Sequence, residues 1–140
     1  MCATYMYKGG NAMLFTLTLE GMRFHAFHGT MEVERELGQV LEISLHFTYE
    51  LGVKDVQDPR KIVSYAQVFS LVENVVMSNK FEAMEALAFE IAKRILNSIP
   101  SGQVAEVGVC RGQLYVPGVL GSSEVNILLT RDDLLEECGE

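Results

Sequence analysis

The feature that most constrains the fold is a long run of strict alternation. From Gln39 to Leu51 the sequence reads QVLEISLHFTYEL, and every second residue is large and apolar. Successive side chains of a strand point to opposite faces, so this pattern predicts one long strand with a single buried face. Such one-sided strands are typical of antiparallel sheets. The residues on the predicted buried face are Leu41, Ile43, Leu45, Phe47 and Tyr49.

Three further segments are also typical of strands. LFTLTL (14–19) alternates in the same way, and we expect Gly21 to bend this strand before it continues through MRFHAF. QVAEVGVC and SEVNILLT, near the end of the chain, predict two more strands. The polar segment HGTMEVERELG lies between two glycines and is interpreted as a loop or hairpin connection.

Two helices are predicted in the middle of the chain. Ser64 and Gln67 form an S-x-x-Q capping box, and a stripe at helical spacing follows, made of Val68, Leu71, Val72, Val75 and Val76. The second helix spans about Ala83 to Ser98 and ends before Pro100 and Gly102.

The predicted order is therefore β-β-α-α-β-β, an α+β fold. We expect a four-stranded antiparallel sheet with two helices on one face, and pairing of its exposed edges between subunits. Residues 13–131 are taken as a single domain, with a flexible leader over 1–12 and an acidic tail over 132–140. Whether Met13 is the true start is left open.

Composition excludes several classes of function. The chain has 140 residues, of which 49% are hydrophobic, and this favours an ordered domain. Its net charge of -8 and the lack of any basic run disfavour nucleic acid as a partner. No apolar run is long enough for a transmembrane helix, and the first residues lack the apolar core of a signal peptide.

Cysteine and histidine spacing gives no metal site. Cys2, Cys110 and Cys138 form no CxxC pair and are interpreted as reduced thiols of a cytoplasmic protein. The three histidines, His25, His28 and His46, share no spacing that would bring three ligands together. A lone histidine such as His28 is more often structural than functional.

Two charged residues lie where a purely structural account explains them poorly. Glu85 falls on the apolar stripe of the second helix, in its first turn. It is either a carboxylate favoured by the helix N-terminus or an acceptor for a planar pair of N–H groups on a ligand. Arg111 interrupts the otherwise uncharged VGVCRGQLYVPG, where a solvated strand end is the simplest interpretation.

Four segments in combination resemble the dihydroneopterin aldolase family: GMRFHAFHGTMEVERELGQ, IVSYAQVF, FEAMEALAFEIAKRIL and VGVCRGQLYVPG. The resemblance runs from about Leu14 to Thr130. It implies the tunnelling fold, with subunits in a ring of four, two rings commonly stacked into an octamer, and sites between neighbours. The implied reaction, in folate synthesis, cleaves 7,8-dihydroneopterin into 6-hydroxymethyl-7,8-dihydropterin and glycolaldehyde, without a metal, Schiff base or cofactor.

The resemblance also implies roles for individual residues. Glu85 takes the position that anchors the 2-amino and N3–H edge of the pterin. Tyr65, from the neighbouring subunit, would help to move protons at the substrate side chain, and Glu34 would support the catalytic hydrogen-bond network. The remaining substrate contacts implied are the backbone at Met84 and Val63, and Thr30 in the loop of Glu34.

Arg111 occupies the place of a family lysine that acts in acid–base catalysis. A guanidinium stays protonated and cannot readily serve as a base, although it can stabilise developing negative charge. Three hypotheses remain: a working aldolase, a pterin-binding relative with altered chemistry such as epimerisation, and a non-catalytic ring-forming pterin binder. The sequence does not decide between tetramer and octamer, nor the substrate stereochemistry, nor whether Lys61 or Lys80 replaces the missing lysine.

Overall fold

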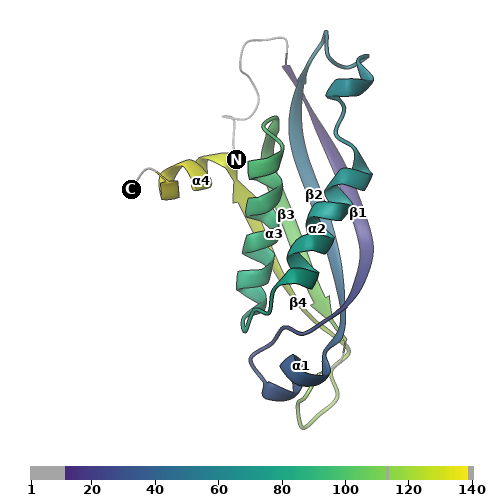
Figure 1. Ribbon diagram of the computed structural model, residues 1–140, viewed down its shortest axis with the longest axis vertical. Helices are drawn as coiled ribbons and strands as arrows, with labels where there is room; N and C mark the ends of the chain where they lie inside the picture. Colours follow the sequence, from purple (N-terminus) through teal and green to yellow (C-terminus); the bar gives the residue numbers. More distant parts are fainter. Residues whose placement is uncertain (1–11, 113, 139–140) are drawn as a thin grey trace.

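The chain forms one antiparallel sheet covered on one face by two helices (Figure 1). The computed structural model describes residues 12–112 and 114–138. The strands β1 (Ala12–Ala26), β2 (Gln39–Gly52), β3 (Gly102–Arg111) and β4 (Ser123–Thr130) lie in the order β1-β2-β3-β4. The helices α2 (Tyr65–Ser78) and α3 (Met84–Ser98) come between β2 and β3 in the chain. The predicted α+β fold is confirmed, and the four strands and two covering helices follow the predicted order.

A bulge in β1 changes which residues face the core. Leu19 pairs with Leu45 and Met22 with Ile43, so Glu20 and Gly21 together oppose one residue of β2. Gly21 has a φ of 76°, a backbone conformation that glycine adopts without steric cost. Residues with odd numbers pack on the core before the bulge, and residues with even numbers from Met22 onward. The expected bend at Gly21 is therefore a change of register.

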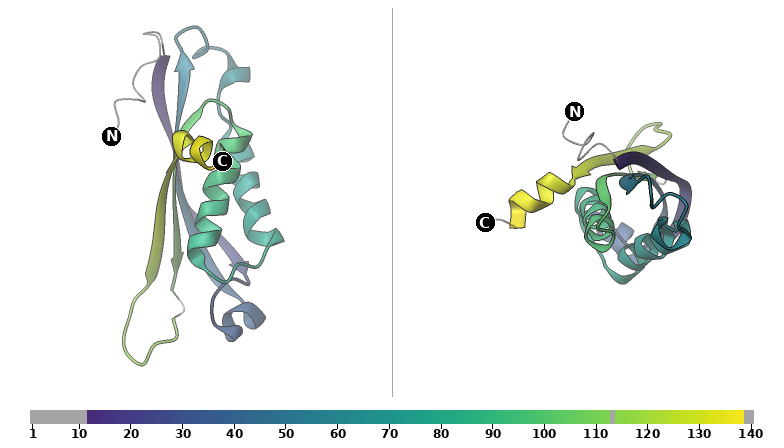
Figure 2. Two further views of the ribbon diagram at one scale, coloured as in Figure 1. Left: turned by 90° about the vertical axis from the view of Figure 1, so that its left-hand side faces the viewer. Right: turned by 90° about the horizontal axis from the view of Figure 1, so that it is seen from above.

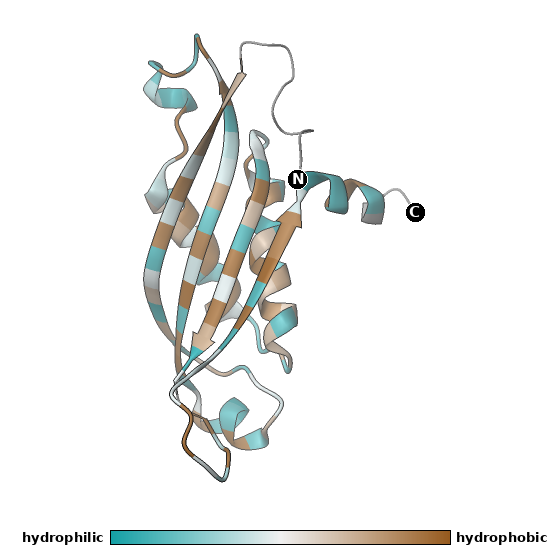
Figure 3. Cartoon of the chain, turned by 180° about the vertical axis from the view of Figure 1, so that it is seen from behind, coloured by the Kyte–Doolittle hydropathy of each residue, from teal (hydrophilic) through white to brown (hydrophobic). Residues whose placement is uncertain are grey.

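The alternation of β2 produces the centre of the core. Leu41, Ile43, Leu45 and Phe47 are fully buried under the helices. Hydrophilic and hydrophobic residues alternate along the strands, as the colouring of the cartoon shows (Figure 3).

Both central helices bury most of the stripes predicted for them. Ser64 Oγ accepts a hydrogen bond from the Gln67 backbone N–H at 3.4 Å, which caps α2. Leu71 is only partly buried; the other four members of the predicted α2 stripe are buried, as are Met84, Leu87, Ala88, Ile91, Ala92, Ile95 and Leu96 of α3. No helix in the described ranges is both long and apolar enough to cross a membrane.

The segment expected as a loop before β2 contains a short helix. Helix α1 spans Glu32–Leu37 and ends at Gly38, whose φ is 76°. Six residues are too few to show a helical period, so the sequence offered only the polarity of the segment. The interpretation of this segment as a plain loop or hairpin was therefore wrong.

The segment expected as an acidic tail continues the fold. Helix α4 covers Arg131–Cys138 and projects beyond the β4 edge (Figure 2). The Arg131 guanidinium donates to the carbonyl oxygens of Gly102, Leu96 and Ile99, at 2.6, 2.6 and 3.0 Å. Leu134 is buried. Of the expected leader over 1–12, only Ala12 lies inside the described residues, and it begins β1.

Candidate functional site

Polar residues from distant parts of the chain gather at one end of the molecule. Helix α1, the first turn of α3 and the end of β3 all lie at this end (Figure 1). It therefore holds three of the residues singled out in the sequence: Glu34 on α1, Glu85 on α3 and Arg111 on β3.

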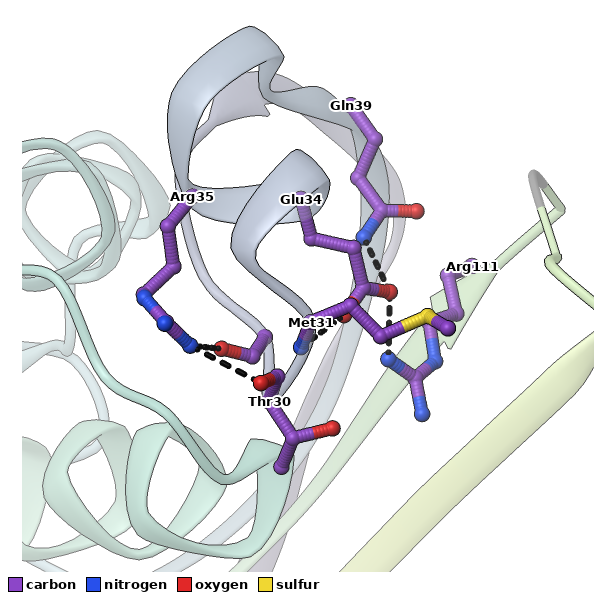
Figure 4. A network of polar contacts seen from close by, with 7 residues as sticks. Thr30, Met31, Glu34, Arg35, Gln39 and Arg111 are labelled. Atoms are coloured by element: carbon purple, nitrogen blue, oxygen red, sulfur yellow. Dashed lines mark hydrogen bonds and ion pairs between the residues drawn. The ribbon is translucent and has the colours of Figure 1, made fainter.

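The centre of this site is an ion pair between Glu34 and Arg111. Arg111 Nη1 donates to Glu34 Oε2 at 3.0 Å, across 77 positions of sequence (Figure 4). The Glu34 side chain is only 4% exposed and that of Arg111 is 24% exposed. A buried carboxylate needs a partner of opposite charge, and the guanidinium supplies it. Arg111 is thus not a solvated strand end.

Gln39, which has no predicted role, completes the cluster. Its Nε2 donates to Glu34 Oε2 at 3.1 Å, which fixes the orientation of the amide. Its Oε1 is buried and has no hydrogen-bond partner among the described residues. Buried polar atoms are usually satisfied, so this acceptor beside a charged pair indicates a place for a donor that the described residues do not supply. The only signal in the sequence was a polar residue at the start of an apolar strand.

The loop before α1 holds the Glu34 carboxylate in place. The Met31 backbone N–H donates to Glu34 Oε1 at 3.1 Å. Arg35 Nη1 donates to the carbonyl oxygens of Gly29 and Thr30, at 2.8 and 3.0 Å (Figure 4). Gly29 has a φ of 147°, and a Cβ there would clash with Glu34 Oε1. The loop therefore has a glycine where the carboxylate lies directly against its backbone, and Thr30 stays exposed.

The Glu85 side chain is not buried, although its place on the apolar stripe predicted burial. It is exposed at the start of α3, whereas Met84, the residue before it, is 3% exposed and belongs to the core. Each residue turns about 100° around a helix, so Glu85 lies at the margin of the stripe that Met84 begins. Its carboxylate lies in the first turn of α3 and is accessible to a group from outside the chain.

Tyr65 lies elsewhere on the chain. It begins α2, and its side chain is 69% exposed in a groove of about 480 Å³ between α2 and the edge strand β1. The groove is lined by Thr18, Leu19, Glu20, Met22, Tyr65, Ala66, Phe69 and Ser70. The start of α2 is separated from α1 along the long axis, so a single chain does not bring Tyr65 to the Glu34–Arg111 pair (Figure 1).

Val63 lies two residues before Tyr65 and is partly buried. It lines a polar hollow of about 440 Å³ together with Arg60, Lys61 and Gln67, among others.

In the described ranges, no group of three histidine, cysteine, aspartate or glutamate side chains is arranged as metal ligands.

Comparison with known families agrees with this arrangement of elements. A family model described as FolB, dihydroneopterin aldolase, matches residues 17–128. The chain belongs to the dihydroneopterin aldolase family. The match covers the whole sheet except the first five residues of β1 and the last two of β4, and it ends before α4.

Individual relatives show the same similarity. A dihydroneopterin aldolase of Streptococcus pyogenes serotype M18 is 31% identical over 94 residues, which cover 66% of this chain and 79% of the relative. One of Staphylococcus haemolyticus is 38% identical over 78 residues, which cover 55% of this chain and 93% of that sequence.

Solved structures of the family share the fold. The crystal structure of E. coli dihydroneopterin aldolase in complex with neopterin superposes with a TM-score of 0.72 at 17% identity. The superposition covers 82% of this chain and 98% of that one. The tunnelling fold expected from the sequence is thus confirmed.

Proposed function

We propose that this family member cleaves 7,8-dihydroneopterin by a retro-aldol reaction to 6-hydroxymethyl-7,8-dihydropterin and glycolaldehyde, as a cytoplasmic enzyme of folate synthesis. The observation that carries the proposal is the buried Glu34 carboxylate, bound by Arg111 and Gln39 next to an amide oxygen that has no partner among the described residues. A buried charged cluster with an unused acceptor has little value for stability alone.

The chemistry requires movement of protons more than redox change. Breaking the bond between the first and second side-chain carbons removes a proton from the second hydroxyl, whose carbon becomes the aldehyde. The electron pair passes into the dihydropterin, which takes up a proton. A positioned acid–base group accelerates such steps by about 10²–10⁴-fold. We assign this transfer to Tyr65 with a water molecule.

Glu85 and the backbone around it form the binding part of the proposed site. A carboxylate meets the 2-amino and N3–H edge of a pterin with two parallel hydrogen bonds. The exposure of Glu85 supports this role, since its carboxylate is available to a ligand. The backbone of Met84 and Val63, and Thr30 beside Glu34, supply the remaining proposed contacts. The E. coli relative, whose structure is a complex with neopterin, supports a pterin as the ligand.

The proposed site is completed by a second copy of the chain. In the described part of the chain, β1 and β4 each pair on one side only, so both edges of the sheet are free. All neighbouring strands are antiparallel, so β1 and β4 run in opposite directions. Copies related by rotation could therefore extend one sheet, β4 against β1, and bring the neighbour's Tyr65 groove toward α3. We propose a tetramer or octamer built in this way.

Arg111 favours a second candidate function. Its guanidinium is bound to Glu34, and a guanidinium supplies positive charge to the reacting side chain but no base. A pterin-binding relative with altered chemistry, such as epimerisation of the side chain, would use the same binding part. A third possibility is a ring-forming protein that binds pterin without turnover.

Direct assay separates these candidates. Incubation of the purified protein with 7,8-dihydroneopterin should release glycolaldehyde in equal amount to 6-hydroxymethyl-7,8-dihydropterin. A stereoisomer of the substrate without glycolaldehyde would indicate the epimerase. Pterin binding with neither product at micromolar enzyme would indicate the non-catalytic protein.

A further inference from the structure

His28 is a buried histidine that the reaction above does not use. Its side chain is fully buried, and both ring nitrogens have backbone partners. The Phe81 N–H lies 2.9 Å from Nδ1, and Nε2 lies 2.8 Å from the Val76 carbonyl oxygen. A backbone N–H can only donate, so Nδ1 is the acceptor and Nε2 carries the hydrogen. His28 is thus held as the neutral Nε2–H tautomer.

The two bonds of His28 join separate segments of the chain. Val76 belongs to the last turns of α2, and Phe81 lies in the connection between α2 and α3. The Gly29 N–H also donates to the Phe81 carbonyl oxygen at 2.9 Å. Both backbone groups of Phe81 are therefore bound by residues 28 and 29, and the His28 and Phe81 rings are stacked with centroids 5.6 Å apart.

Each side of this junction leads to one part of the proposed site. Phe81 lies three residues before Met84, where α3 begins and Glu85 follows. On the other side, Gly29 packs so closely against Glu34 that no Cβ could be accommodated. A shift of residues 28 and 29 would therefore move the Glu34 carboxylate, and a shift of Phe81 would move the start of α3.

We propose that His28 is a positioning residue, which holds the Glu34 loop and the Glu85 end of α3 at a fixed separation by accepting the Phe81 N–H. The proposal rests on the proposed function for its kinetic consequence, but not for the linkage itself. It assigns different roles to the two ring nitrogens. The Nδ1 bond to Phe81 sets the geometry of the site, and the Nε2 bond to Val76 secures the ring against α2.

Two substitutions separate these roles. In His28→Asn the side-chain oxygen lies near the position of Nδ1 and can accept the Phe81 N–H, while the donor to Val76 is lost. In His28→Gln the amide nitrogen reaches the position of Nε2 and can donate to Val76, while the acceptor for Phe81 is lost. His46→Gln is the matched control, because His46 lies on the uncovered face of the sheet and bonds only to Thr18 in the described structure.

The kinetic test compares kcat and KM for 7,8-dihydroneopterin, together with the affinity for neopterin. We expect His28→Gln to lose about tenfold or more in kcat/KM and in neopterin affinity, since misplaced binding groups weaken substrate and product alike. His28→Asn and His46→Gln should stay within about threefold of the unmodified protein. Equal losses in the two His28 variants, in proportion to their unfolding midpoints, would show a merely structural histidine.

Two measurements judge the linkage independently of activity. Hydrogen exchange should accelerate over residues 29–35 and 79–88 in His28→Gln and not in His28→Asn; no difference between them would overturn the proposal. The ring ¹⁵N shifts of His28 in the unmodified protein should show the Nε2–H tautomer, and the Nδ1–H tautomer would overturn it without any variant. If the unmodified protein releases no glycolaldehyde, the proposed function fails while these two measurements still decide the role of His28.

Discussion

Arg111 and Glu34 form a 3.0 Å ion pair between the end of β3 and helix α1. Neither residue stands out alone in the sequence, since Glu34 lies in a run with Glu32 and Glu36, and Arg111 follows an apolar strand. The pair turns a strand end and a polar loop into one charged cluster at the end of the sheet. Its chemistry depends on which cation stands opposite the carboxylate.

The Arg111→Lys variant should be a faster aldolase than the unmodified protein. A lysine can lose its proton when partly buried and can therefore take part in acid–base steps, whereas a guanidinium cannot. Acid–base catalysis contributes about 10²–10⁴-fold, so we expect kcat to rise by about tenfold or more. The measurement is glycolaldehyde release at saturating 7,8-dihydroneopterin. The control Arg111→Gln, which removes the charge, should be slower; an unchanged or lower rate for the lysine variant would mean a site built around arginine.

Loss of the Glu85 carboxylate should weaken pterin binding without unfolding the protein. Hydrogen bonds to a charged group are worth about 1.5–3 kcal/mol, so Glu85→Ala should lower neopterin affinity by about 10–100-fold. Because the Glu85 side chain is exposed, the midpoint of thermal unfolding of the Glu85→Ala variant should lie close to that of the unmodified protein. Equilibrium binding and thermal unfolding check the two statements. Glu73→Ala, an exposed position on α2, is the control, and equal affinities for both variants would remove Glu85 from the site.

A site shared between subunits can be tested by mixing two inactive variants. If Tyr65 comes from one copy and Glu85 from its neighbour, then Tyr65→Phe and Glu85→Ala impair every site when expressed separately. When the two variants assemble at random in equal amounts, about a quarter of the sites contain both native residues. Co-expression should therefore restore about a quarter of the native rate. No recovery in a mixed oligomer would indicate that both residues serve the same site within one chain.

Arg131 should stabilise the fold without affecting the reaction. Its guanidinium joins the end of α3 to the start of β3 by donating to the carbonyl oxygens of Leu96, Ile99 and Gly102. Burial lowers the pKa of Arg131 from its ordinary value. Replacing it by methionine should lower the free energy of unfolding by about 1–3 kcal/mol, because carbonyls near the α3 end lose a charged donor. Arg23→Met, at a side chain that is 72% exposed, should cost little. Arg131 follows the end of β4 that lies farthest from Arg111, so kcat and KM should be unchanged, and urea unfolding with steady-state kinetics checks both.

His28 should also make stability depend on pH in the acid range. Burial lowers its pKa below the ordinary value of 6.5, while the backbone bond to Val76 raises it in part. The unfolded chain therefore binds the proton first as the pH falls. The contribution of His28 to the free energy of unfolding is complete above about pH 6.5. It is lost as the pH falls toward the pKa of His28 in the folded protein, by at most about 1.4 kcal/mol per pH unit.

Urea unfolding between pH 7.5 and 5.5 measures this slope. The His28→Asn variant should lose less stability over that interval than the unmodified protein, because its residue 28 does not titrate. His46→Gln is the control and should keep the slope that His28 produces in the unmodified protein. Parallel stability curves for the His28→Asn variant and the unmodified protein would show that the proton on His28 is not linked to folding.

Much of the fold could be predicted because its signals are local. The alternation around Leu45 and the helical stripe around Val72 each identify an element from neighbouring residues alone. Helix α1 was missed because six residues show no period, and α4 because acidity was the dominant feature of its sequence. A segment that follows an edge strand packs only a few apolar side chains against the fold. Leu134 alone was too weak a signal to predict a packed helix.

The candidate site was harder to predict, since it depends on contacts distant in sequence. Glu34 bonds to a residue 77 positions away, and no local pattern distinguishes it from Glu32. The spacing of the apolar residues correctly placed Glu85 in the first turn of α3. It wrongly predicted a buried side chain, because a residue at the margin of an apolar stripe is exposed in the first turn. Gln39 and His28 gain their importance from partners that only the folded chain supplies.

The bulge at Gly21 also limits which assemblies the chain can form. It divides the outer edge of β1 into two segments whose side chains alternate out of phase. The first segment, Ala12 to Leu19, has the same length as β4, which has 8 residues. A partner that slid past the bulge would present its apolar side chains to water. A kinked edge also makes a poor template for indefinite growth of a sheet. The bulge therefore disfavours aggregation through the β1 edge, while the segment from Ala12 to Leu19 remains available to pair with β4 of a neighbouring copy.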